Sequence, residues 1–203
     1  MNDVVEIRWH GRGGQGTATA ARMTAAMASA EGKHFQAFPA FRDDAPPRRG
    51  EPVVAFTRIS DAPIEEHAEA GSPGIVVVFD ASLLGRPEVT QGLPDDAIVL
   101  VNSDLSPEQL REKNALRGFR LYCVSASRIA RETAAADYPN TALIGALSRV
   151  TGLFPLETVA AGVRADLSKN FPAQVVEANV EAARRSYGEV RGERDNTAAA
   201  PVG

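Results

Sequence analysis

A glycine-rich turn near the start of the chain carries the residue pattern with the clearest chemistry. Glycines spaced G-x-G-x-x-G lie between an apolar run and an alanine-rich segment. Glycines let backbone amides approach an anion closely, and a helix that follows adds the positive end of its dipole. The pattern therefore predicts an anion-facing loop. Its candidate residues are Gly11, Arg12, Gly13, Gly14, Gln15 and Gly16.

Three interpretations of this turn stay open. The glycine spacing fits a dinucleotide-binding fingerprint, but that fingerprint needs an Asp or Glu about 20 residues further on to hold the ribose hydroxyls. Gln36, Phe38 and Pro39 occupy that place, which disfavours independent NAD binding. The turn then either packs the first helix on a sheet or faces a phosphate or a partner surface.

Two arginines form a second candidate anion site. Arg48 and Arg49 stand beside Gly50 in a proline-stiffened segment, and guanidinium groups match the geometry of phosphate oxygens. The alternatives are that they pair with acidic groups such as Asp43 and Asp44, or with a partner subunit.

Asn140 and Thr141 are predicted to cap the helix that follows them, because Asn is a favoured N-cap residue; the alternative is that this helix start faces a cofactor. His10 directly follows the first strand, so we expect it to be packed or hydrogen-bonded. No carboxylate pair or nucleophile–base pair can be picked out, and we assign no catalytic residue.

Cysteine and histidine counts limit the redox and metal chemistry of the chain. Cys123 is the only cysteine, whereas an iron–sulfur cluster takes about four thiolates. The three histidines are scattered without metal-site spacing, so we assign no metal ligands. Electron carriers are therefore expected on other chains, and Cys123 is expected to be an inert core thiol.

The composition is that of an ordinary globular protein. The 203 residues are 44% hydrophobic and 24% charged, with a formal net charge of −4. That charge argues against nucleic-acid binding, which needs a basic surplus. The longest apolar runs are far shorter than the roughly 20 residues of a membrane span, and the N-terminus shows no signal peptide. We expect a cytoplasmic protein that contacts neither nucleic acid nor membrane.

Periodicity predicts strands that alternate with helices. Strands are expected at residues 4–9, 34–38, 53–59, 75–80, 97–102 and 119–124. Helices are expected at residues 17–30, 106–114, 127–136, 140–150, 155–167 and 172–187. The pattern indicates an α/β fold with a Rossmann-like, doubly wound, mostly parallel sheet and a helical C-terminal part. Residues 1–187 are expected to form one domain, and residues 188–203 a disordered tail.

The chain resembles the gamma subunit of pyruvate:ferredoxin oxidoreductase and its 2-oxoacid relatives. The likeness begins at Glu6–Gly16 and spans roughly residues 4–187. Further blocks that resemble the family are Gln36–Pro39, Arg48–Val53, Ala55–Ile59, Asn140–Leu147, Thr151–Leu153 and Asn179–Tyr187. Residues 41–47 depart from the pattern, because relatives usually carry a shorter, glycine-containing stretch there.

The resemblance implies a multi-subunit enzyme that converts a 2-oxoacid and coenzyme A into acyl-CoA and carbon dioxide. Thiamine diphosphate with Mg would act as the electron sink on alpha and beta subunits, and [4Fe-4S] clusters on a ferredoxin-like delta subunit would carry the electrons away. They would pass to ferredoxin or, through a further flavin subunit, to NAD.

This chain would bind no cofactor alone, and its loops would help to shape the approach of coenzyme A. On this basis, replacing Arg48 or Arg12 by Ala is expected to raise the coenzyme A requirement more than the 2-oxoacid requirement. The alternatives from other classes are a stand-alone NAD(P)-binding Rossmann enzyme and a purely non-catalytic assembly module.

Overall fold

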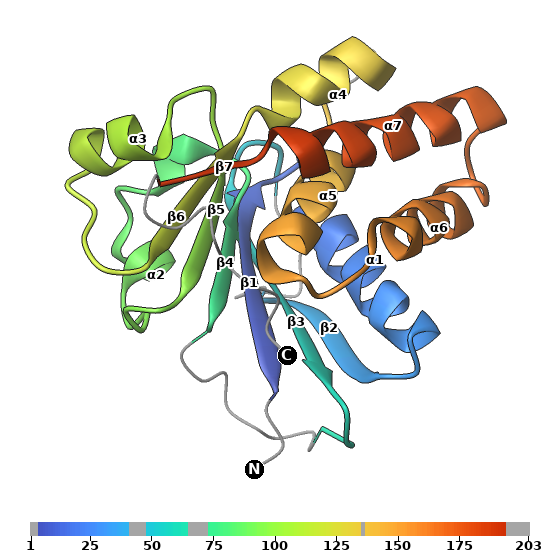
Figure 1. Cartoon of the computed structure of the whole chain (residues 1–203), viewed down its shortest axis with the longest axis horizontal. Helices are drawn as coiled ribbons and strands as arrows, with labels where there is room; N and C mark the ends of the chain where they lie inside the picture. Colours follow the sequence, from blue (N-terminus) through green and yellow to red (C-terminus); the bar gives the residue numbers. More distant parts are fainter. Residues whose placement is uncertain (1–3, 41–47, 65–72, 135–136, 194–203) are drawn as a thin grey trace.

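A seven-stranded mixed sheet forms the centre of the computed structural model, which describes residues 4–40, 48–64, 73–134 and 137–193 (Figure 1). The strands are β1 (Val5–Arg12), β2 (His34–Ala40), β3 (Pro52–Ser60), β4 (Ile75–Val78), β5 (Ile98–Asn102), β6 (Arg120–Val124) and β7 (Arg191–Gly192). Their order across the sheet is β2-β3-β1-β4-β5-β6-β7. Strands β1, β4, β5 and β6 are parallel, whereas β2, β3 and β7 are each antiparallel to their neighbours.

Helices cover the two faces of this sheet unequally (Figure 1). The described helices are α1 (Thr17–Ala30), a short 3-10 helix η1 (Ala81–Leu83), α2 (Pro87–Thr90), α3 (Pro107–Lys113), α4 (Ala126–Ala134), α5 (Asn140–Thr151), α6 (Leu156–Leu167) and α7 (Ala173–Glu189). Helices α1, α5, α6 and α7 lie on one side of the sheet, and α2 and α3 lie on the other. No helix in the described ranges is long and apolar enough to cross a bilayer.

The central strands are buried on both faces, as their continuous apolar runs predict. Val77 of β4 joins the core cluster beneath α1 and α5, whereas Val76 and Val78 join the cluster beneath α2 and α3. The expected fold class is confirmed, and the helix starts are close to their predicted positions. The Ser106 cap is also confirmed, because its hydroxyl accepts from the Gln109 amide in a capping box.

The ends of β1, β2 and β4 differ from the prediction, and β4 ends at Val78 rather than at residue 80. Strand β1 continues beyond Trp9 to Arg12, because residues 10–12 pair with residues 52–54 of β3. Pro39 does not stop β2, which runs to Ala40. Since β2 is the edge strand of the sheet, a residue without an N–H group is tolerated there.

The predicted tail begins too early. Helix α7 continues to Glu189, and β7 then adds an antiparallel edge to β6. Glu193 accepts a hydrogen bond from Arg111 Nη2 at 2.7 Å, which ties this segment to α3. Residues 194–203 lie outside the described ranges, as does the departing segment at 41–47.

Helices α5 and α7 approach each other closely at Gly145. A Cβ atom on this glycine would lie 2.1 Å from the carbonyl oxygen of Ala183, so only a residue without a side chain fits. Ser186 of α7 donates to the carbonyl of Ala142 at 2.5 Å in the same crossing. The two helices therefore pack backbone against backbone.

Candidate functional site

The glycine-rich turn is braced by the segment that leads into β3. The Gly13 amide donates to the Glu51 carbonyl at 2.8 Å, and the Gly50 amide donates to the Gly13 carbonyl at 3.0 Å. A Cβ atom at Gly13 would lie 2.1 Å from the carbonyl oxygen of Arg48. Gly13 thus serves a close approach of two backbones.

This arrangement also explains why the dinucleotide fingerprint fails. The neighbour of β1 on this side is β3, which runs antiparallel and brings its first residues to the turn. A dinucleotide-binding fold has a parallel strand there, with an acid at its carboxyl end. Here the corresponding space holds the turn at Arg48–Glu51.

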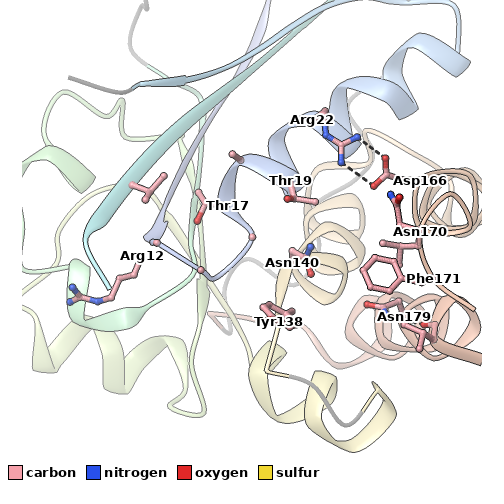
Figure 2. A pocket seen from close by; sticks show the side chains of 17 residues that line it. Arg12, Thr17, Thr19, Arg22, Tyr138, Asn140, Asp166, Asn170, Phe171 and Asn179 are labelled. Atoms are coloured by element: carbon pink, nitrogen blue, oxygen red, sulfur yellow. Dashed lines mark hydrogen bonds and ion pairs between the residues drawn. The ribbon is translucent and has the colours of Figure 1, made fainter. Parts of the chain in front are cut away.

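Arg12 forms a clamp within the chain. Its Nε donates to Asp80 Oδ2 at 2.6 Å, Nη2 to Ser82 Oγ at 2.8 Å, and Nη1 to the Gly50 carbonyl at 3.1 Å. Partial burial alone would raise the pKa of Asp80, but hydrogen bonds from Ser82 and Arg12 hold it below its ordinary value. Arg12 is one of the lining residues of the pocket described next, but its guanidinium points away from the other labelled side chains (Figure 2). Its role in anion binding therefore stays a prediction.

A pocket of about 680 Å³ opens between the glycine turn and the C-terminal helices (Figure 2). Its walls come from the turn, the start of α1, the start of α5, the end of α6 and the first half of α7. Its polar lining residues include Thr17, Thr19, Arg22, Asn140, Asp166, Asn170 and Asn179. Segments far apart in sequence therefore form one polar cavity.

The start of α1 supplies hydrogen-bond donors to this pocket. Gly16 is the N-cap residue with φ 83°, and within the described residues no side chain caps the helix and no acid lies in its first turn. The Thr17 hydroxyl is buried and has no partner in the described part of the chain. Uncapped amides at a helix start favour an anion.

Asn140 faces the same helix start. A Cβ atom on Gly16 would lie 3.1 Å from Asn140 Nδ2, which places this amide against the turn. The predicted capping role is wrong, because Pro139 holds the N-cap position and no side chain of the described residues caps the helix. Asn140 is therefore the first residue of α5, and its side chain lines the pocket.

Thr141 is not a cap either, and it is buried behind the pocket. Its hydroxyl donates to Asn179 Oδ1 at 3.0 Å, while Asn179 Nδ2 donates to the Val175 carbonyl at 2.9 Å. Thr141 therefore orients Asn179, which does line the pocket.

Arg48 and Arg49 lie beside the turn but not among the lining residues of the pocket. Both are exposed, and a Cβ atom on Gly14 would lie 3.5 Å from Arg49 Cγ. Among the described residues, no carboxylate forms an ion pair with either arginine. The suggested partners Asp43 and Asp44 lie outside those residues.

Several residues that line the pocket were not predicted from the sequence, among them Arg22, Asp166 and Phe171. Arg22 and Asp166 form an ion pair with Nη1–Oδ1 at 2.6 Å (Figure 2). Tyr138 and Phe171 are 58% and 50% exposed, respectively, which is unusual for large aromatic side chains. The signal was an aromatic residue at each helix boundary, Tyr138 before Pro139 and Phe171 before Pro172. The pocket thus combines anion-friendly donors with aromatic surface.

His10 and Cys123 belong to the protein interior. Burial first, and the charge of Arg8 second, lower the pKa of His10 to about 4. Burial raises the pKa of the Cys123 thiol to about 12, so it is a buried protonated thiol at neutral pH, in line with the prediction. Within the described ranges, no three His, Cys, Asp or Glu side chains gather as a metal site.

Known proteins match this chain over nearly its whole length. The family model described as pyruvate ferredoxin/flavodoxin oxidoreductase matches residues 6–189. The pyruvate/ketoisovalerate oxidoreductases common subunit gamma of Pyrococcus abyssi is 43% identical over 91% of this chain and 96% of its own length. The pyruvate synthase subunit PorC of Thermotoga maritima is 41% identical over 92% of this chain and 94% of its own length.

Solved structures agree with these matches. The crystal structure of pyruvate oxidoreductase subunit PORC from Thermotoga maritima superposes with a TM-score of 0.80 and 39% identity, covering 94% of this chain and 98% of the other. A 2-oxoglutarate:ferredoxin oxidoreductase from Magnetococcus marinus shares the fold at a TM-score of 0.73 and 18% identity, and it covers 93% of this chain and 31% of the other. The chain therefore belongs to the pyruvate ferredoxin/flavodoxin oxidoreductase family.

Proposed function

We propose that this chain is the gamma subunit of a multi-subunit 2-oxoacid:acceptor oxidoreductase, which converts a 2-oxoacid and coenzyme A into acyl-CoA and carbon dioxide. Family membership and the names of the relatives, which are subunits of pyruvate oxidoreductases, support this function. The single buried cysteine fits a division of labour in which other subunits carry the electrons.

The cofactors of the proposed complex reside on the other subunits. When bound on the alpha and beta subunits, thiamine diphosphate with Mg would supply the electron sink for decarboxylation. The [4Fe-4S] clusters of a ferredoxin-like delta subunit would supply the route for electrons toward ferredoxin or, through a flavin subunit, toward NAD. The role of this chain's own residues is to bind and orient coenzyme A.

The polar pocket is the part of this chain that we assign to coenzyme A. Coenzyme A combines phosphate groups with a planar adenine ring. The uncapped start of α1 and the amide of Asn140 fit phosphate oxygens, while Tyr138 and Phe171 offer surfaces for an aromatic ring. This combination of anion donors and exposed aromatic side chains is the observation that carries the proposal.

Asn140→Asp tests this assignment. The substitution keeps the side-chain shape and adds a negative charge at the start of α5, where the helix dipole tolerates it, but that charge would repel phosphate in the pocket. In the reconstituted complex we expect the KM for coenzyme A to rise at least about tenfold, equivalent to about 1.4 kcal/mol, with little change in the KM for the 2-oxoacid.

Asn114→Asp is the matched control, because Asn114 follows α3 on the opposite side of the sheet. It should change neither KM. Equal changes in both KM values for Asn140→Asp would instead point to a role in assembly.

Arg48→Ala tests the exposed arginine beside the turn. Loss of one charge-assisted contact with a phosphate costs about 1.5–3 kcal/mol, so the KM for coenzyme A should rise more than tenfold. An unchanged KM would leave coenzyme A binding to the pocket itself and remove Arg48 from the site.

A further inference from the structure

Two arginines line the pocket, and their guanidinium groups have different partners. Arg12 makes hydrogen bonds to three groups beside the glycine turn, so its donors are already occupied there. Among the described residues, Arg22 of α1 donates only to Asp166 of α6, through Nη1 at 2.6 Å and Nη2 at 3.1 Å. Arg22 is therefore the arginine of the pocket that can bind a further group.

The ion pair with Asp166 leaves part of the Arg22 guanidinium available. A guanidinium carries more N–H donors than one carboxylate accepts, and Nε of Arg22 makes no hydrogen bond within the described ranges. The Arg22 side chain is 58% exposed, whereas that of Asp166 is 12% exposed. Asp166 thus fixes the orientation of a guanidinium that remains open to a ligand.

The local charge at this ion pair favours an anion. Lys169 Nζ lies 4.0 Å from Asp166 Oδ1, so Arg22 and Lys169 share a single carboxylate. These three side chains together carry one positive charge in excess. A phosphate beside Arg22 would meet this positive charge.

Helices α1 and α6 run antiparallel, and this arrangement places the end of α6 beside the start of α1. Met27 lies against Gly162, since a Cβ atom there would lie 2.5 Å from Met27 Cγ, and Arg22 then meets Asp166 further along α6. Residues that follow Asp166 therefore lie close to the first turn of α1. Ala18, one turn before Arg22 on the same face, also lines the pocket and leaves space between Arg22 and the uncapped amides.

The aromatic part of the pocket continues from the same wall. Figure 2 shows Asn170 and Phe171 next to Asp166 on the side that faces α1, and both line the pocket. The start of α1, the Arg22 guanidinium and an exposed aromatic ring therefore surround one cavity. They offer two separate positions for anionic groups and one for a planar ring.

This combination matches the nucleotide end of coenzyme A. Its ribose carries the adenine ring, the 5′-diphosphate and a separate 3′-phosphate, so three different contacts must converge around one sugar. The start of α1 and the aromatic side chains suit the diphosphate and the adenine, respectively. The 3′-phosphate needs a second cationic contact, and the open guanidinium of Arg22 suits phosphate geometry.

We propose that Arg22 binds the 3′-phosphate of coenzyme A, and that this contact makes the pocket prefer coenzyme A over dephospho-coenzyme A. Asp166 is the positioning residue that holds the Arg22 guanidinium. This inference rests on the proposed function, because it requires that the pocket binds coenzyme A. It adds a residue that determines specificity within that pocket.

A comparison of coenzyme A with dephospho-coenzyme A in the reconstituted complex tests the proposal. With the wild-type chain, the KM for dephospho-coenzyme A should be at least about tenfold higher, because a charge-assisted contact is missing. Arg22→Gln should raise the KM for coenzyme A to a similar level and leave the KM for dephospho-coenzyme A nearly unchanged. A residue that only supported the fold would change both KM values alike.

Arg164→Gln is the matched control. Arg164 of α6 forms a similar two-point ion pair with Glu177, with Nε–Oε1 at 2.7 Å and Nη2–Oε2 at 2.8 Å, but it is not among the lining residues of the pocket. Its substitution should change neither KM. Thermal melting of the full chain checks that both variants fold.

Three results would overturn the proposal. They are equal KM values of the wild-type complex for the two forms, an Arg22→Gln variant that keeps the wild-type preference, and an equal loss of preference in Arg164→Gln. If Arg22→Gln does not fold, Arg22→Lys carries the same test. It keeps the charge without the paired donors, so the preference should fall, and an unchanged preference would refute the contact.

Asn140→Asp separates this inference from the proposed function. If it raises the KM for both forms while Arg22→Gln keeps the preference, the pocket is retained and only the role of Arg22 is refuted. If Asn140→Asp changes neither KM, the assignment of coenzyme A to the pocket fails, and the role of Arg22 fails with it. Coenzyme A-dependent turnover that does not need this chain would refute the proposed function itself.

Discussion

Trp9 and His10 are neighbours on β1, and both are almost completely buried, yet they meet opposite environments. Trp9 Nε1 donates to Thr57 Oγ1 at 3.0 Å, and Thr57 in turn donates to the Ala21 carbonyl at 3.0 Å. His10 is 4% exposed, but its Nε2 has no partner in the described ranges. Among the described residues, the polar group of the Trp9 side chain therefore has a partner, whereas the Nε2 atom of His10 has none.

This difference shows that one short segment serves two purposes. The segment from Glu6 to Gly16 contains polar residues of β1 and then the glycine turn at the pocket. Its apolar members, Ile7 and Trp9, anchor the sheet to the helical layer. Substitutions of the apolar residues should therefore lower the stability of the fold, whereas substitutions in the glycine turn should change ligand binding.

The largest loss of stability is expected from a substitution of Trp9. Trp9→Ala removes a fully buried ring that packs edge to face with Phe79 at 6.4 Å between centroids. Large-to-small changes of this kind cost about 3–5 kcal/mol. Chemical denaturation of the full chain measures the loss in the free energy of unfolding. A loss below about 1 kcal/mol would contradict the role of Trp9 as a fully packed core residue.

A smaller, pH-dependent change in stability is expected from His10. Since the pKa of His10 is about 4 in the folded chain and about 6.5 when unfolded, the unfolded chain binds a proton between these pH values and the folded chain does not. Stability should therefore fall as the pH decreases through this window, by about 2 kcal/mol between pH 7 and pH 5.

His10→Gln should abolish this share of the pH dependence, while His34→Gln at an exposed position should preserve it. Denaturation curves at the two pH values measure both. Identical pH profiles for His10→Gln and the wild-type chain would show that His10 titrates normally.

The smallest effect concerns the helices that cover β4 to β6. Ser106→Ala removes the hydroxyl that caps α3 and should cost about 1 kcal/mol. Because α3 contributes no residue to the lining of the pocket, the KM for coenzyme A should not change. A change in that KM would show that α3 and the pocket are coupled through the sheet.

The sequence predicted those features that depend on local patterns. The apolar runs at 75–80 and 97–102 identified buried parallel strands, and the Ser-Pro-Glu sequence at 106–108 identified a helix start. The direction of β3 could not be predicted, because a strand pattern has the same period in either direction. The antiparallel β3 nevertheless decides what occupies the space beside the glycine turn.

The candidate site was predicted in part. The residues of the glycine turn and Arg48, Arg49 and Asn140 were each named as candidates from the sequence, but only the structure shows that they lie in one region. Asp166, Phe171 and Asn179 were missed, because their proximity to the turn comes from the packing of α6 and α7 and leaves no trace in local spacing. Asn140 was misjudged because helix boundaries are the least certain part of a sequence pattern, and a shift of one residue changed its role.

The contact at Gly145 links the pocket to the C-terminal end of the chain. Because the backbones of α5 and α7 are in contact there, we expect the two helices, and with them Asn140 and Asn179, to move together. A methyl group at residue 145 would force α5 and α7 apart, because it would clash with the backbone of Ala183. The separation would shift the wall of the pocket without changing any side chain that lines it.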